Sequence, residues 1–402
     1  MPSQSPGTDL ISANEAKETI IRHAQHLTPK TVPLLDAAGL VSAEDVISPV
    51  DIPNFNQSSM DGYAISCQDW KRDHPMKILG EMAAGNGAQF VLIPGTAARI
   101  FTGAPVPDGA DTVIMQEKTR IEEGLLFIED TMLQPGSNIR VKGAEIKSGQ
   151  LAIKEHSLLT PAAIGFLAGI GITHVSVYPQ PKLGIIVTGN ELQTPGEALL
   201  YGQVYESNSW SLQAALHQMH IREINLHRVE DSHSAVVGTL QMALAESDVI
   251  CLTGGVSVGD YDFVAAAARE LGVEKVFHKI KQKPGKPFYF GKKGNKLVFG
   301  LPGNPASVMS CFYMYVEPAL KKIARLNSAI RSIRVPLSTG FKKAPGLTHF
   351  LKGFYDGQSA IPLSAQESFR LSSFADANCL IRIEEEVSVC DAGELVEIHL
   401  LP

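Results

Sequence analysis

The sequence predicts a multidomain α/β protein whose central domain is doubly wound around a mostly parallel sheet. The main observation is an alternation between Pro181 and Leu326, where the pattern runs strand, helix, strand, helix, strand, helix, strand. Such alternation implies right-handed crossovers and a parallel sheet covered by helices on both faces. The second observation is length, because 402 residues are enough for about two to four domains.

The first part of the chain predicts a helical linker domain, formed by residues 1–50 together with 140–178. Ser12 and Glu15 form a capping-box pattern, and apolar residues follow at helical spacing. A second helix is expected to open at Thr160-Pro161, because proline is favoured at the first helical position. We expect this helix to pack with the first one, so that the segment between them is an insertion.

Two regions predict small β domains. Residues 51–139 contain short β-type runs separated by GNG, IPG, APVPDG and EEG turns, which indicates an inserted β domain. Short alternating strands return over 329–402, the last being 395–400, and they predict a C-terminal small β-barrel. The α/β domain is therefore expected to span 179–328.

Composition limits the function and the compartment. A formal net charge of −7 argues against a general nucleic-acid or anionic-membrane binder. Five scattered cysteines without CxxC spacing fit a reducing compartment. The N-terminus lacks the pattern of a secretory signal, and the uncharged stretch 157–173 is shorter than the roughly 18 apolar residues of a membrane span. We expect a cytoplasmic protein.

Chemistry-bearing residues follow the predicted strands of the α/β domain. Ligands of such sheets bind at the carboxyl ends of the strands, so these loops are expected on one edge. Glycines in the TGGVSVGD segment allow backbone N–H groups to approach a phosphate or similar oxyanion, and a serine adds a donor. Carboxylates crowded against that anion would require a hard cation such as Mg²⁺. The cradle residues are Gly254, Gly255, Ser257 and Gly259, and the candidate metal ligands are Glu191, Asp231, Asp260 and Asp262.

Each of these patterns has a structural alternative. Glycines and aspartates in strand-to-helix loops are commonly turns and N-caps. The segment KQKPGKP places Lys283 and Lys286 on a proline-stiffened stretch, which suits an oxyanion clamp, although a solvated basic turn is the commoner outcome for a lysine run. In the β insertion, Asp61 is expected at a turn, and Thr102 offers a hydroxyl beside a glycine.

Taken together, the motifs resemble those of the MoeA-type molybdopterin molybdenumtransferases, a family shared with the E domain of gephyrin. The resemblance covers about residues 10 to 400 and is looser over the last seventy or so. The motifs, in chain order, are SSMDGYAI, IFTGAPVP, GADTVIMQE, NIRVKGAEI, VTGNEL, TGGVSVGDYDF, KPGKP and GLPGNPAS.

The resemblance implies the last step of molybdenum cofactor synthesis: molybdate is inserted into adenylylated molybdopterin, and AMP is released with the help of Mg²⁺. It also implies a homodimer in which the inserted domain of one subunit completes the site of the other, and contacts with other molybdenum cofactor proteins. The implied catalytic residues are Asp61, Thr102, Glu191, Asp231 and Asp262. The implied substrate-binding residues are the four cradle residues with Lys283, Lys286, Pro302, Pro305 and Ser307.

Some positions depart from the family pattern, and other functions stay open. Asn56 and Asn190 stand where aspartate is common, Glu145 replaces an aspartate, and Lys352 occupies a frequent arginine position, for which Arg370 is a possible substitute. The alternatives to the transferase are a non-catalytic scaffold of the gephyrin kind and a molybdopterin adenylyltransferase that uses ATP.

Overall fold

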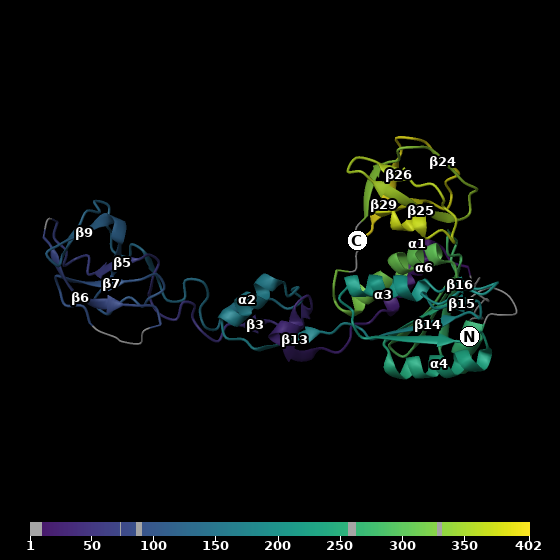
Figure 1. Ribbon diagram of the computed structural model, residues 1–402, viewed down its shortest axis with the longest axis horizontal. Helices are drawn as coiled ribbons and strands as arrows, with labels where there is room; N and C mark the ends of the chain where they lie inside the picture. Colours follow the sequence, from purple (N-terminus) through teal and green to yellow (C-terminus); the bar gives the residue numbers. More distant parts are fainter. Residues whose placement is uncertain (1–9, 73, 86–90, 256–262, 328–331) are drawn as a thin grey trace, which may run out of the picture. The chain divides into compact units, whose positions relative to one another are not determined.

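A computed structural model describes residues 10–72, 74–85, 91–255, 263–327 and 332–402. Its internal contacts divide the chain into two compact units. The first unit contains residues 1–30, 39–41 and 178–402, and the second contains residues 31–38 and 42–177 (Figure 1). Each unit has its own hydrophobic clusters. The four predicted domain ranges remain predictions.

The inserted segment of the second unit forms one six-stranded sheet in the order β8-β5-β7-β6-β10-β9. Gly62 in the central strand β5 permits a close approach, because a Cβ there would overlap the carbonyl group of Ile114 on β8. The SSMDGYAI motif therefore needs its glycine for strand pairing. The strand bounds are β5 Gly62–Ile65, β6 Met76–Met82, β7 Thr96–Ile100, β8 Thr112–Met115, β9 Thr119–Glu122 and β10 Leu125–Ile128.

The remainder of the second unit is a small region with the α-helix α2 (Pro161–Gly169) and a 3-10 helix at Leu34–Ala37. The helix begins as expected: Thr160 is its N-cap and Pro161 is at its start. Short strands complete the region in the sheets β1-β13-β2 and β12-β3. Their bounds are β1 Lys30–Pro33, β2 Val41–Ser42, β3 Val46–Ile47, β12 Leu151–Ile153 and β13 His174–Tyr178.

The first helix, α1 (Ala13–His23), corrects one expectation. It begins at the predicted cap, where the backbone N–H of Glu15 donates to the Ser12 hydroxyl. Its buried residues Ala13, Ala16 and Ile20 join the core of the first unit, however, whereas α2 belongs to the second unit. The physical reason is that the apolar face of α1 packs against the apolar helical segment 312–323.

The α/β domain is built on a six-stranded sheet in the order β17-β14-β18-β22-β21-β19. The first four strands are parallel to one another. Strand β21 pairs antiparallel with β22 and with β19, so the sheet is mixed. Only two residues, 294 and 295, separate β21 from β22, and so short a hairpin connection forces antiparallel pairing. The bounds are β14 Leu183–Thr188, β17 Ile224–Val229, β18 Val249–Thr253, β19 Glu274–Lys279, β21 Pro287–Lys293 and β22 Lys296–Leu301.

Helices cover both faces of this sheet. Alternate strand residues point to opposite faces, so that Ile186 packs with α4 and α5 whereas Ile185 and Val187 pack with the other helices. Figure 1 shows α4 and α3 on opposite sides of β14. The bounds are α3 Asn208–Gln218, α4 His233–Glu246, α5 Phe263–Glu270, α6 Pro305–Cys311 and α7 Glu317–Ile323, with a π-helix at Phe312–Val316 between the last two.

The chain ends in a β domain, as predicted. Its main sheet has the order β20-β25-β27-β29-β23, with β26 paired to β25, and β24 pairs with β28. Closure of these strands into a barrel stays a prediction. The bounds are β20 Gln282–Lys283, β23 Ser332–Pro336, β24 Phe341–Lys342, β25 Thr348–Tyr355, β26 Ala360–Pro362, β27 Cys379–Ile383, β28 Val389–Cys390 and β29 Leu395–Leu400.

Among the helices of the described residues, none is long and apolar enough to cross a membrane.

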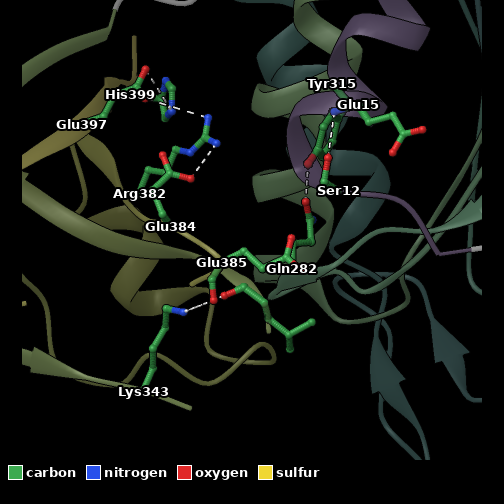
Figure 2. Close-up of polar contacts among 11 residues, drawn as sticks. Ser12, Glu15, Gln282, Tyr315, Lys343, Arg382, Glu384, Glu385, Glu397 and His399 are labelled. Atoms are coloured by element: carbon green, nitrogen blue, oxygen red, sulfur yellow. Dashed lines mark hydrogen bonds and ion pairs between the residues drawn. The ribbon is translucent and has the colours of Figure 1, made fainter. Parts of the chain in front are cut away.

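His399 on β29 is a titratable group in the core of the first unit. Its side chain is 2% exposed, and its Nε2 lies 3.9 Å from Oε1 of Glu397 (Figure 2). Neither ring nitrogen has a hydrogen-bond partner among the described residues. Burial lowers the pKa of His399 to about 4; Glu397 opposes this shift, and the positive charges of Lys17 and Arg382 add to it.

We expect the stability of the first unit to fall between about pH 6.5 and pH 4. The pKa of His399 is depressed in the folded state. Above about pH 6.5 the ring is neutral in the folded and the unfolded chain, so it causes no loss of stability. As the pH falls toward 4, the unfolded chain binds the proton first, and this shifts the equilibrium toward unfolding. This one group would destabilise the fold by about 2 kcal/mol at pH 5. His399→Leu should narrow the gap between the melting temperatures at pH 7.5 and pH 5. An unchanged gap would contradict this account.

Candidate functional site

A pocket of about 610 Å³ lies in the first unit at the carboxyl ends of β14, β18 and β22. Loops from the α/β domain and from the C-terminal β domain line it together. The lining residues are Thr188, Gly189, Glu191, Asp231, Gly254, Gly255, Gln282, Lys283, Pro284, Gly285, Lys286, Pro287, Pro302, Gly303, Asn304, Ser307, Leu347, Gln366 and Ser368.

Hydrogen bonds join the loop after β14 to the loop after β17. The Thr188 hydroxyl donates to Oδ1 of Asp231 at 2.9 Å, and the backbone N–H of Asp231 donates to Oδ1 of Asn190 at 3.1 Å. An amide oxygen at Asn190 accepts this bond as a carboxylate oxygen would. The departure from aspartate at position 190 therefore preserves the local structure and removes a negative charge next to the pocket.

The predicted glycine cradle is described only in its first part. Gly254 and Gly255 line the pocket with φ angles of +86° and +62°, and a Cβ on Gly254 would overlap the carbonyl oxygen of Thr188. These backbone conformations favour glycine, and the close approach requires it. Four other residues of this loop lie outside the described residues, and their roles remain predictions: Ser257, Gly259, Asp260 and Asp262.

Two of the four predicted metal ligands, Glu191 and Asp231, line the same pocket. Within the described ranges, the structure contains no group of three histidine, cysteine, aspartate or glutamate side chains that could hold a metal ion. Carboxylate oxygens are nevertheless the donors that Mg²⁺ prefers, and this ion commonly uses only one or two protein carboxylates besides substrate phosphates. The two carboxylates therefore fit the ligand preference of such an ion.

The predicted lysine pair also reaches the pocket. Lys283, the last residue of β20, and Lys286, in the turn that follows, are exposed and line the pocket. The backbone supports the turn at both ends: the N–H of Ile280 donates to the carbonyl oxygen of Lys286 at 3.0 Å, and β20 pairs with β25 of the C-terminal domain. The basic turn therefore contributes to the site.

The GLPGNPAS segment supplies another wall. Pro302 and Ser307 line the pocket, whereas Pro305 is not among the lining residues and instead starts α6 at a favoured position. Asn304 Nδ2 donates to the Ser368 hydroxyl at 2.7 Å, which connects this loop to the C-terminal domain.

Several lining residues were not predicted from the sequence. Gln366 and Ser368 come from an irregular loop of the C-terminal domain. Lys352, which is 3% exposed, holds this loop with its ammonium group. Its Nζ donates to the carbonyl oxygens of Ala365, Glu367 and Arg370 at 2.7, 3.2 and 3.0 Å, respectively. Burial lowers the pKa of Lys352.

Asp61 and Thr102 are brought together in the second unit. The backbone N–H and the hydroxyl of Thr102 each donate to Oδ1 of Asp61 at 2.7 Å. These hydrogen bonds from Thr102, followed by the charge of Arg99, lower the pKa of Asp61. Asp61 is therefore an exposed, ionised carboxylate held in a fixed orientation.

Asn56 and Glu145, which depart from the family pattern, also lie in the second unit. Oδ1 of Asn56 accepts a hydrogen bond from the backbone N–H of Lys142 at 3.0 Å. The backbone N–H of Glu145 donates to the carbonyl oxygen of Ile52 at 2.9 Å. An amide oxygen at position 56 therefore accepts the bond that a carboxylate oxygen could accept, and the side chain of Glu145 is exposed.

Three family models match the chain in succession. They are the MoeA N-terminal region (domain I and II) at residues 11–171, a probable molybdopterin binding domain at residues 184–322, and the MoeA C-terminal region (domain IV) at residues 334–401. The chain thus has a MoeA-like multidomain fold with a mixed-sheet domain and a C-terminal β domain.

Individual relatives agree over nearly the whole length. The molybdopterin molybdenumtransferase of Haemophilus influenzae is 36% identical, over 92% of this chain and 94% of the relative. That of a Nostoc species is 34% identical, over 92% and 88%. The crystal structure of the molybdopterin biosynthesis MoeA protein from Pyrococcus horikoshii matches with a TM-score of 0.82 and 31% identity, over 97% of this chain and 99% of that one. The chain therefore belongs to the family of the molybdopterin molybdenumtransferases, and it is a transferase enzyme.

Proposed function

We propose that this transferase inserts molybdate into adenylylated molybdopterin and releases AMP in a reaction that depends on Mg²⁺. The observation that carries the proposal is one pocket that gathers two carboxylates, a glycine turn and two lysines. A site that binds anions next to a hard cation needs basic groups for the anions and carboxylates for the cation, close to one another. The names of the relatives from Haemophilus and Nostoc support a role in molybdenum cofactor biosynthesis.

The substrate phosphates would bind at the glycine turn. At Gly254 and Gly255 the backbone lies at the pocket wall without side chains to keep a ligand away. Backbone N–H groups in such turns donate to phosphate oxygens. Ser257 and Gly259, which follow in the sequence, extend this part of the proposal.

Lys283 and Lys286 would hold molybdate, the second substrate. Both are exposed side chains on a turn stiffened by Pro284 and Pro287. Two ammonium groups on a short turn attract a compact dianion, and the prolines reduce the entropy lost when the lysines are ordered. We propose Pro302 and Ser307 as further contacts of the bound substrates.

Glu191 and Asp231 would hold Mg²⁺, together with Asp260 and Asp262. When bound, the ion supplies charge neutralisation at the phosphoryl oxygens. Oδ1 of Asp231 already accepts the Thr188 hydroxyl, so this bond orients the carboxylate and leaves Oδ2 to face a ligand. Orientation by a neighbouring hydrogen bond is typical of carboxylates that serve as metal ligands.

The assembly that we propose is a cytoplasmic homodimer that also contacts other molybdenum cofactor proteins. Asp61 and Thr102 belong to the second unit and the pocket belongs to the first. In the proposed dimer, the Asp61–Thr102 pair of one subunit completes the pocket of the other. The lowered pKa of Asp61 supports a carboxylate that stays ionised in such a site.

The direct test is a reaction of the purified protein with adenylylated molybdopterin, molybdate and Mg²⁺. We expect AMP release that requires both molybdate and the divalent ion, and molybdenum bound to the pterin product. The absence of AMP release under every tested condition would refute the proposal. Consumption of ATP with molybdopterin would instead indicate an adenylyltransferase.

Asp231→Asn tests the metal-binding carboxylates. The amide keeps an oxygen that can accept the Thr188 hydroxyl, so the melting temperature should stay close to that of the wild type. Loss of the charge should cut turnover at least tenfold, which is about 1.4 kcal/mol of transition-state stabilisation. Raising the Mg²⁺ concentration should recover part of the rate.

Glu230→Gln is the matched control, because Glu230 precedes Asp231 in the same loop and does not line the 610 Å³ pocket. Its turnover should equal that of the wild type. Equal losses in both variants would indicate a general electrostatic effect and not metal binding.

Mixing two inactive variants tests the shared site. In a heterodimer of Asp61→Ala and Asp231→Ala chains, one site carries both defects and the other carries neither. We therefore expect activity to return when the subunits exchange, with up to half of the sites in each heterodimer recovering. AMP release would be measured before and after mixing, and exchange would be followed with differently labelled subunits.

If activity stays absent after demonstrated exchange, the proposed sharing between subunits is wrong. The structural alternative makes a different forecast. If Asp61 only stabilises its turn through Thr102, Asp61→Ala should lower the melting temperature and leave the folded fraction active.

A further inference from the structure

Gln282 is a buried amide directly next to the lysine turn. It precedes Lys283 on β20 and is 1% exposed. Its Nε2 donates to the carbonyl oxygens of Pro284 at 2.9 Å and Gly285 at 3.3 Å. One side chain thus binds the carbonyl groups of the two residues that lie between Lys283 and Lys286.

Tyr315 holds Gln282 from the other side. Its hydroxyl donates to Oε1 of Gln282, and Figure 2 shows the two side chains pointing toward each other. Tyr315 is 1% exposed and lies on the π-helix Phe312–Val316. π-Helical turns are rare and often occur at functional sites. With its oxygen bonded, the Gln282 amide has a defined orientation, because only its nitrogen can donate to the carbonyl groups.

Packing leaves the turn little room to move. A Cβ on Gly285, whose φ is +87°, would lie 2.5 Å from Sγ of Cys311 and 2.9 Å from Nε2 of Gln282. The backbone N–H of Thr348 donates to the carbonyl oxygen of Lys281 at 2.9 Å, just before the turn. The inner side of the turn is therefore packed against buried groups, whereas the lysines on its outer side are exposed.

We propose that Gln282 and Tyr315 are positioning residues that fix Lys283 and Lys286 for oxyanion binding. The inference rests on the proposed function, because it takes the two lysines as the molybdate ligands. Gln282 lines the pocket, but its polar atoms are bonded to Tyr315, to the turn and to Sγ of Cys311, so it acts through the lysines. Two cations bind one anion well only when their spacing is fixed before binding.

The test compares Gln282→Met with Lys286→Ala. Methionine keeps the length and apolar volume of glutamine but has no amide. Both variants should raise the molybdate concentration needed for half-maximal AMP release, Gln282→Met by about fivefold or more. The half-saturating concentration of adenylylated molybdopterin should change by less than about twofold. A role confined to stability would not separate the two substrates in this way.

Tyr315→Phe gives a milder second variant, because it removes only the hydroxyl. Its effect on molybdate dependence should be in the same direction and smaller. The double variant should be no worse than Gln282→Met alone, since Tyr315 acts through Gln282. Tyr313→Phe on the same π-helix is the matched control and should behave as the wild type. Melting temperatures would confirm that all variants are folded.

Titration calorimetry with molybdate alone separates this inference from the proposed function. If the wild type binds molybdate and Lys286→Ala weakens binding while Gln282→Met and Tyr315→Phe do not, the positioning role is wrong and the lysine role stands. If the wild-type affinity does not depend on Lys286, the proposed lysine role fails, and the positioning role fails with it. Additive effects of the Gln282 and Tyr315 substitutions would also overturn the inference.

Discussion

The site depends on the parallel register of β14, β17, β18 and β22. Thr188 is opposite Val229 on one side, Val187 is opposite Thr253 on the other, and Thr253 is opposite Leu301. These strands therefore end at nearly the same level, and the loops that follow them emerge at one edge of the sheet. The buried strand residues on both faces stabilise this register, because a shift by one residue would move each apolar side chain to the other face.

Much of this edge could be predicted from the sequence, because each loop follows a recognisable apolar strand. Gly254, Gly255, Glu191 and Asp231 were placed in that way, and all four line the pocket. The antiparallel end of the sheet was missed, although the two-residue connection at 294 and 295 is a local hairpin signal. The helical and β-type segments were thus easier to predict than the direction in which the last strands pair.

The contribution of the C-terminal domain could not be predicted, because it depends on how that domain docks and not on a local pattern. Gln366 and Ser368 reach the pocket from a loop in which buried Lys352 binds three carbonyl groups. Gln282 lies in a basic segment in which the lysines carry the chemical signal of the sequence, and its burial beneath the turn accompanies the pairing of β20 with β25. Such supporting residues are visible only once the packing is known.

Lys352 and Arg370 also show how positive charge is used in a chain with a net charge of −7. An ammonium group can be buried when it is fully hydrogen-bonded, and Lys352 meets this condition with three carbonyl oxygens. Arg370 pairs instead with Glu367, with its Nε 3.1 Å from Oε2. Its charge is therefore partly neutralised, and it does not take over the contacts of Lys352.

The charge of Lys352 stabilises the loop, which leaves Lys283 and Lys286 as the exposed cations lining the described pocket. An anionic substrate would thus be attracted by two lysines whose turn is held by neutral groups, the amide of Gln282 and the hydroxyl of Tyr315.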